Sequence, residues 1–163
     1  MTPLLNLVLF CPQIPNNTGS IGRTAAATGC RLHVVHPIGF SMDEKARRRA
    51  GLDYWDAVDC VEHADFDAYR RDADPPRLWL YSVRAERPHW EADFLPGDHL
   101  LFGREADGVP DHVHDWVVDT WGGDHRLALP MRPDPRMRSL NQSNAVTAAV
   151  YEAMRQIRPP WAR

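Results

Sequence analysis

Short apolar runs separated by helical patterns constrain the fold more than any other feature of this sequence. The run at 4–10 is almost entirely apolar, as expected of a parallel strand that is covered on both faces. Strands that alternate with helices form parallel sheets, so we expect an α/β fold with a mainly parallel sheet flanked by helices. The length of 163 residues suits a single domain spanning 1–163. Further strands are predicted at 31–36, 57–62, 78–83, 99–103 and 126–129.

Helix signals mark several segments between these strands. Asn17 offers an N-cap for an alanine-rich helix, which Gly29 would end. A capping box opens a short basic helix within 41–51. Helices are also expected at 65–71 and from Asn141 onward, where apolar residues share one helical face.

Composition narrows the class of protein. No stretch approaches the roughly 18 apolar residues of a membrane helix, and the N-terminus has no basic leader, so we expect no membrane association. Cys11, Cys30 and Cys60 are widely spaced and form no CxxC motif, which favours reduced thiols in the cytoplasm. The net charge of -3 argues against nucleic acid as a partner, although arginines clustered at 47–49 and within 126–138 could form a local basic face.

Polar, glycine and proline residues gather in three segments where strands should end, which is where open α/β sheets bind ligands. The first segment, 15–23, contains Asn17 and Arg23, and the helix that starts between them offers free backbone N–H groups to an anion. On this segment alone, an ordinary asparagine cap followed by a surface arginine is the favoured interpretation. The segment holds Gly19 and Gly22 but not the GxGxxG pattern of dinucleotide-binding proteins.

The other two segments follow later strands. In 101–110, Gly103 would allow a flat ligand to approach the backbone and Glu105 follows in a loop, although a routine turn is an equally good interpretation. In 138–146, polar side chains crowd the start of an otherwise apolar helix, and a cap needs only one of them. The remaining polar side chains must face water, a ligand or a buried partner. This segment therefore favours a functional role over a plain helix cap. The crowded residues are Ser139, Asn141, Gln142, Ser143 and Asn144.

Other catalytic patterns are absent from the sequence. It has no HExxH, no histidine and cysteine set with zinc spacing, no GxSxG elbow and no Walker motif. We therefore expect no metal site, and we interpret the eight histidines as surface or packing residues. Trp79 and Trp116 lie in apolar runs, which indicates core positions.

Taken in order, the three segments resemble the three motifs of the SpoU branch of the SPOUT (trefoil-knot) RNA methyltransferases. Within that branch, the short chain is similar to the TrmL-type tRNA wobble-position ribose 2′-O-methyltransferases, and the resemblance runs almost end to end. Any one motif is weak, but their joint order and spacing are specific. The matching residues are Gln13-Ile14-Pro15-Asn16-Asn17-Thr18-Gly19, Gly39-Phe40, Arg48-Arg49-Ala50-Gly51-Leu52-Asp53-Tyr54, Phe102-Gly103-x-Glu105-x-x-Gly108-x-Pro110 and Arg138-Ser139-Leu140-Asn141-x-Ser143-Asn144.

This resemblance implies a C-terminal trefoil knot, a homodimer, and S-adenosyl-L-methionine (SAM) as methyl donor, with S-adenosyl-L-homocysteine as product and no metal. It also implies methylation of the cytidine or uridine ribose at tRNA position 34, with leucine isoacceptors as expected substrates. The family's cofactor contacts would fall on Tyr81, Gly103, Leu129, Met131 and Ser139. Its catalytic motif residues would fall on Asn17, Arg23, Glu105, Ser139 and Asn141. Arg47, Arg48 and Arg49 would contact the tRNA backbone.

Alternative functions remain open at this point. The same chemistry could act on rRNA or on another tRNA position, or the scaffold could serve a non-catalytic RNA-binding protein. A nucleotide-dependent oxidoreductase on an ordinary Rossmann sheet would need the glycine fingerprint that this sequence lacks. The stretch 132–137 looks longer than in the family, which would reshape the cofactor loop next to Met131.

Overall fold

The computed structural model describes residues 2–43 and 53–162. Most of the basic helix expected within 41–51 lies outside this part of the chain, and so do Arg47, Arg48 and Arg49. Of the helices that are described, none has both the length and the apolar composition needed to cross a membrane.

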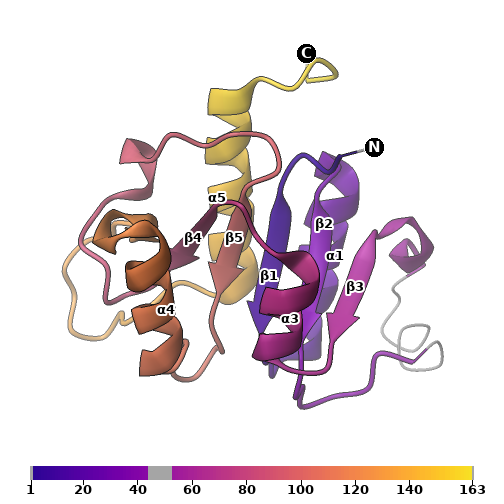
Figure 1. The fold of residues 1–163 in the computed structure, drawn as a ribbon, viewed down its shortest axis with the longest axis horizontal. Coiled ribbons are helices and arrows are strands. Elements are labelled where there is room, and N and C mark those ends of the chain that lie inside the picture. The colour runs from indigo at the N-terminus through magenta and orange to yellow at the C-terminus, as the bar shows by residue number, and fades with distance from the viewer. Residues whose placement is uncertain (1, 44–52, 163) are drawn as a thin grey trace.

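Within the described residues, six strands form one sheet in the order β3-β2-β1-β5-β4-β6, and every neighbouring pair is parallel (Figure 1). The expected α/β fold with a parallel sheet is therefore confirmed. The strands are β1 (Asn6–Phe10), β2 (Arg31–Val35), β3 (Cys60–His63), β4 (Leu78–Tyr81), β5 (His99–Phe102) and β6 (Arg126–Leu127). The helices are α1 (Pro15–Thr28), α3 (Phe66–Ala73), α4 (Asp111–Trp121) and α5 (Gln142–Ile157), with short 3₁₀ helices η1 (Trp55–Ala57), η2 (His89–Glu91) and η3 (Gly123–His125).

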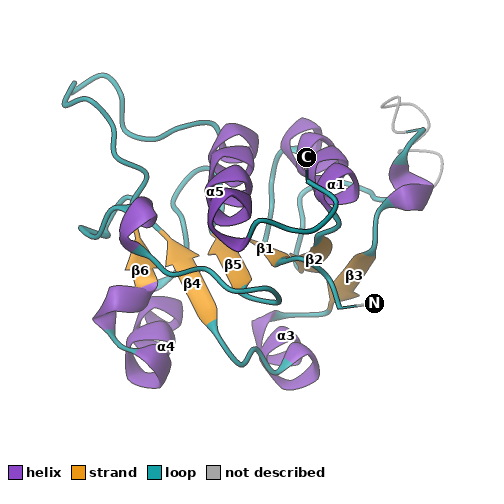
Figure 2. Ribbon diagram, turned by 90° about the horizontal axis from the view of Figure 1, so that it is seen from above, coloured by secondary structure: helices purple, strands orange, loops and turns teal. Residues whose placement is uncertain are grey.

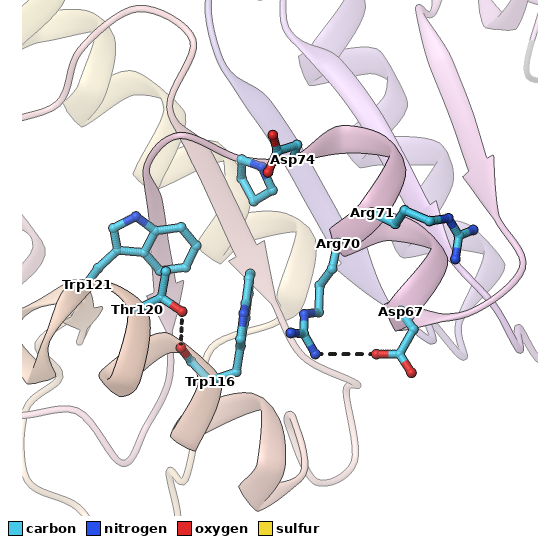
Figure 3. Close-up of a pocket in the computed structure, with 8 residues that line it drawn as sticks. Asp67, Arg70, Arg71, Asp74, Trp116, Thr120 and Trp121 are labelled. Carbon is cyan, nitrogen blue, oxygen red and sulfur yellow. Dashed lines mark hydrogen bonds and ion pairs between the residues drawn. The ribbon is translucent and has the colours of Figure 1, made fainter.

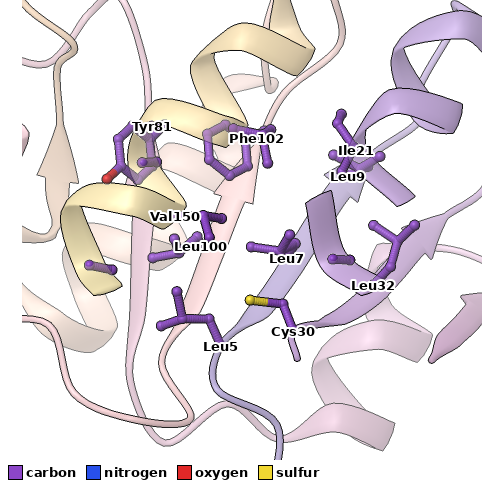
Figure 4. Close-up of a cluster of buried hydrophobic side chains, with 14 of the residues drawn as sticks. Leu5, Leu7, Leu9, Ile21, Cys30, Leu32, Tyr81, Leu100, Phe102 and Val150 are labelled. Atoms are coloured by element: carbon purple, nitrogen blue, oxygen red, sulfur yellow. The ribbon is translucent and has the colours of Figure 1, made fainter. Parts of the chain in front are cut away.

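The helices cover both faces of the sheet. Helices α1 and α5 pack on one face, and α3 and α4 pack on the other (Figure 2). Alternate side chains of β1 point to opposite faces, so Leu7 joins the core under α1 and α5, whereas Val8 joins the core under α3 and α4. Figure 4 shows the first of these cores, to which α1 contributes Ile21 and α5 contributes Val150. Burial on both faces explains why β1 is nearly continuous in apolar residues.

The start of α1 differs from the sequence-based expectation. The helix begins at Pro15 rather than after a cap at Asn17, and Ile14 takes the cap position without a side-chain hydrogen bond. Proline is favoured at the first helical position because it has no N–H to leave unpaired and its φ suits a helix. The expected end of α1 is confirmed, since Gly29 adopts the left-handed conformation with a φ of 68°.

The other helices mostly follow the expected pattern. Asn141 caps α5 by accepting hydrogen bonds from the backbone N–H groups of Ser143 and Asn144, so the expected start of this helix is confirmed. The sequence does not predict α4, because its buried face places His114 next to Val113, which weakens the apolar period.

The parallel arrangement places the carboxyl ends of all the strands at one edge of the sheet. Strand β4 lies between β5 and β6, with Tyr81 in register with Phe102 and Leu127. Strand β5 also pairs with β1. The segments that follow β1, β4, β5 and β6 therefore leave the sheet at neighbouring points, where open parallel sheets bind ligands.

Candidate active site

The carboxylate of Glu105 closes the start of α1. Its oxygens accept hydrogen bonds from the backbone N–H groups of Gln13 (2.9 Å) and Ile14 (3.1 Å), and from the side-chain amide of Asn17 (3.2 Å). The unpaired N–H groups at a helix start attract an anion. The anion expected at this helix start is therefore supplied by the protein itself.

Asn17 connects Glu105 to the start of α5. Its side chain is buried, and its Oδ1 accepts a hydrogen bond of 3.0 Å from Asn141 Nδ2. Asn141 Oδ1 in turn accepts hydrogen bonds from the backbone N–H (3.0 Å) and the hydroxyl (2.6 Å) of Ser143. Side chains from the three polar segments thus form one continuous hydrogen-bonded chain, which we call the Glu105–Asn17–Asn141 chain.

Gly103 lies where the loop after β5 folds back on itself. Arg104 and Gly108 exchange two backbone hydrogen bonds of 3.0 Å, and a Cβ on Gly103 would lie 2.3 Å from the carbonyl carbon of Gly108. The close approach expected at Gly103 is thus made by the backbone of its own loop. The Gly103 carbonyl accepts a 2.7 Å hydrogen bond from the buried Gln142 side chain, which joins the end of β5 to α5.

Three of the sequence-predicted cofactor residues occupy the same edge of the sheet. Tyr81 is the last residue of β4, Gly103 directly follows the neighbouring strand β5, and Leu129 follows β6. The ring of Tyr81 is buried and stacks on Phe102 at 4.8 Å between centroids, and burial raises the pKa of its hydroxyl above the ordinary value. The Tyr81 side chain therefore belongs to the core as a neutral phenol. Leu129 and Met131 are half-buried, and Ser139 is exposed.

Among the predicted site residues that the structure describes, none forms a hydrogen bond or ion pair with Arg23. Its guanidinium carbon lies 4.4 Å from the ring centroid of Tyr54. Across residues 2–43 and 53–162, no hydrogen bond or ion pair joins Arg23 to Gly103 or Ser139. Six residues separate Arg23 from Asn17, which is roughly 9 Å along a helix axis. Arg23 therefore lies beyond the Glu105–Asn17–Asn141 chain within this subunit.

Three residues of the site were not assigned roles by sequence reasoning. Gln13 contributes only its backbone N–H, which no side-chain pattern reveals. Gln142 is visible among the crowded polar residues at the start of α5, but its partner is a carbonyl on another strand. Tyr54 contacts α1 from a distant segment, so nothing in its local sequence indicates the contact.

A separate polar cluster is buried on the face of the sheet that α3 covers. His33 Nδ1 lies 2.9 Å from His63 Nε2, His33 Nε2 lies 3.1 Å from Asn6 Oδ1, and the Tyr69 hydroxyl lies 2.8 Å from His99 Nδ1. Burial lowers the pKa of His33 to about 3 and that of His99 to about 4. These buried histidines pack as neutral rings, as the sequence interpretation expects. No three His, Cys, Asp or Glu side chains of the described residues are grouped to hold a metal ion.

A hollow of about 410 Å³ lies between α3 and α4, on the face of the sheet opposite α1 and α5 (Figure 3). Arg70 lies 5.0 Å from the ring centroid of Trp116 and pairs with Asp67 at 3.4 Å. Trp116 is thus half-buried beside this hollow, whereas Trp79 is a core residue as predicted. None of the predicted site residues lines the hollow, and its arginines are balanced by aspartates, so it does not favour an anionic ligand.

Comparisons with known proteins identify the family of this chain. The model of the SpoU rRNA Methylase family matches residues 4–151. The chain is 44% identical over 154 residues to a tRNA (cytidine(34)-2'-O)-methyltransferase from Saccharophagus degradans, which covers 94% of this chain and 96% of the relative.

Solved structures show the same fold. A solved structure that concerns the 2-OH methylation of C/U34 on tRNA aligns with this chain with a TM-score of 0.81 at 44% identity. The alignment covers 94% of this chain and 91% of that chain. The SpoU methyltransferase AviRb from Streptomyces viridochromogenes, in complex with AdoMet, aligns with a TM-score of 0.74 at 27% identity, covering 96% of this chain and 61% of that chain.

Proposed function

Because this chain belongs to the SpoU rRNA methylase family, we propose that it transfers a methyl group from SAM to the ribose 2′-hydroxyl of the nucleotide at position 34 of tRNA. The observation that carries this proposal is the Glu105–Asn17–Asn141 chain, which joins the three motif segments. The full-length similarity to a relative named for this activity supports the choice of substrate. We take leucine isoacceptors as the expected tRNAs.

The described residues fit SAM as the methyl donor. Leu129 and Met131 are half-buried apolar residues that could contact the flat adenine. Gln142, held against the Gly103 carbonyl, keeps a buried side-chain oxygen with no partner among the described residues, so an acceptor is available to a ligand donor. The sulfonium of SAM supplies an activated methyl group, so the proposed reaction uses no metal.

The protein must align the ribose oxygen with the methyl group and let the hydroxyl proton leave. SAM would supply the methyl group and would be released as S-adenosyl-L-homocysteine, and the proton of the 2′-hydroxyl would pass to solvent. We assign Arg23 to the phosphate beside the target nucleotide, where it would orient the 2′-hydroxyl. A guanidinium gives up its proton only above about pH 12. We therefore assign Arg23 mainly to orienting the 2′-hydroxyl and only secondarily to acting as a base. Glu105 and Asn17 hold together the loop after β5, the start of α1 and the start of α5.

We also propose the homodimer and the C-terminal trefoil knot of the family for this chain. Exposed apolar or aromatic side chains on or next to α1 and α5 support a second subunit: Ile14 is 44%, Leu140 is 43% and Tyr151 is 56% exposed. Within the described residues, no hydrogen bond or ion pair joins Arg23 to Asn17, Glu105, Ser139 or Asn141, so a dimer would let it serve the partner's site. A tRNA substrate would place the enzyme in the cytoplasm.

The proposed function is tested by nucleoside mass spectrometry of tRNA after incubation with the enzyme and SAM. We expect one 2′-O-methylated ribose at position 34, SAM binding by calorimetry, and a dimer by light scattering at micromolar concentration. Methylation of rRNA or of another tRNA position would favour the alternative substrates. RNA binding without SAM binding would favour the non-catalytic alternative.

Charge reversal of Arg47, Arg48 and Arg49 to glutamate is expected to weaken tRNA binding at least about tenfold at 100 mM salt, because each substitution removes a contact with a phosphate. The dependence of tRNA affinity on salt concentration should fall as well. Calorimetry should show unchanged SAM affinity. The control is Arg71→Glu on α3, an exposed arginine on the face away from α1, which should leave tRNA affinity within about twofold. Unchanged tRNA affinity in the triple variant would contradict the prediction.

A further inference from the structure

The guanidinium of Arg23 rests on an aromatic ring rather than on a carboxylate. Its central carbon lies 4.4 Å from the ring centroid of Tyr54. No residue of the described chain forms an ion pair with the Arg23 side chain. A guanidinium that stacks on a ring uses its face, and its N–H donors point outward in the guanidinium plane. The ring therefore occupies one side of the Arg23 guanidinium and leaves its hydrogen-bond fork available.

The ring of Tyr54 is itself fixed to the helix that carries Arg23. The Tyr54 hydroxyl donates a 2.7 Å hydrogen bond to the carbonyl of Gly19, which lies one helical turn before Arg23. The next residue, Trp55, is buried, and a Cβ on Gly22 would lie 2.5 Å from its ring. The hydroxyl and the neighbouring indole thus hold Tyr54 against α1 at two points.

We propose that Tyr54 is a positioning residue for Arg23, which holds the guanidinium fork in one orientation before RNA binds. This inference rests on the proposed function, in which Arg23 binds the phosphate beside the target ribose. A free arginine samples many rotamers, and ordering it during binding or reaction opposes both steps. A ring that already holds the guanidinium removes that cost from the methyl-transfer step.

The ring and the hydroxyl can be tested separately. Tyr54→Phe keeps the ring and is expected to retain kcat within about threefold, whereas Tyr54→Leu should lower kcat about 3- to 30-fold, the range of a cation–π contact. The KM for SAM and the SAM affinity by calorimetry should stay unchanged in both variants. A general loss of structure would change SAM affinity and the melting temperature as well. Wild-type kcat in Tyr54→Leu would overturn the proposal.

A double-mutant cycle shows whether Tyr54 acts through Arg23. In an Arg23→Lys background, which keeps the charge but loses the planar fork, Tyr54→Leu should cost little further activity. Equal losses from Tyr54→Leu in both backgrounds would mean that the two residues act independently, and this would overturn the positioning role while leaving the proposed function intact.

A second measurement does not depend on activity. The ring current of Tyr54 should shift the Nε–H resonance of Arg23 in the NMR spectrum. We expect this shift in the wild type and in Tyr54→Phe and its loss in Tyr54→Leu. The same Arg23 resonance position in all three proteins would overturn the proposal. If the wild type shows the shift but methylates no tRNA, the proposed function fails, and with it the role of the stack in methyl transfer.

Discussion

Alanine at Gly103 is expected to lower kcat/KM for tRNA methylation by at least about a hundredfold, the usual cost of misplacing reacting groups by an ångström. The added Cβ would lie 2.3 Å from the carbonyl carbon of Gly108 and 2.6 Å from the backbone nitrogen of Val109. Both contacts are with backbone, so no side chain can turn away to relieve them. The loop that carries Glu105 must move, and Glu105 then loses its hydrogen bonds to the start of α1.

A matched glycine separates this effect from a general loss of stability. Gly123, at the start of η3, would place a Cβ with no atom within 4 Å, so Gly123→Ala should keep wild-type activity. Overpacking at Gly103 costs about 1–3 kcal/mol, which thermal melts by circular dichroism would report. A folded Gly103→Ala enzyme with wild-type kcat/KM would contradict the assignment of this loop to the site.

The strands of this fold are predictable because burial on both faces of the sheet requires short runs that are rich in apolar residues. The run at 99–103 is mostly apolar, and the run at 31–36 contains Leu32, Val34 and Val35; they form β5 and β2 within one residue at each end. Helix α4 shows no clear apolar pattern in the sequence, because Trp116 is only half-buried and His114 lies on the buried side of the helix. Its position depends on packing against β4 and η3 rather than on a clear helical period.

The site is only partly predictable because its contacts join residues that are distant in sequence. The hydrogen bond from Asn17 to Glu105 spans 88 residues, and the one from Asn141 to Asn17 spans 124. Sequence reasoning identified these three residues by their unusual local surroundings, and by resemblance. From the local segment alone it favoured a cap at Asn17, because a short polar side chain at a helix start normally serves its own backbone. The carboxylate of Glu105 takes that role instead, which frees the Asn17 side chain to bridge two loops.

Acidification from pH 7.5 to 4.5 is expected to remove roughly 5 kcal/mol of folding free energy through His33 and His99 alone. Burial lowers the pKa of His33 to about 3 and that of His99 to about 4, from an ordinary value of 6.5. Below pH 6.5, His33 and His99 therefore bind protons in the unfolded chain but stay neutral in the folded chain. The stabilisation is complete above pH 6.5 and is lost as the pH falls toward the folded values. A typical domain has only about 5–15 kcal/mol to lose.

This pH window isolates the histidines from the carboxylates. The pKa of Glu152 is lowered to about 2 by its hydrogen bond with Arg155, so its contribution is lost only below about pH 4.5. In urea unfolding followed by circular dichroism, His33 and His99 together should contribute about 2.4 kcal/mol per pH unit to the stability slope between pH 6 and 4.5. His112→Gln, at an exposed position of α4, should leave that slope unchanged.

The imidazole resonances of His33 and His99 should not move above pH 5 in the folded protein. A flat stability profile, or resonances that titrate near pH 6.5, would show that the buried cluster accepts protons without unfolding.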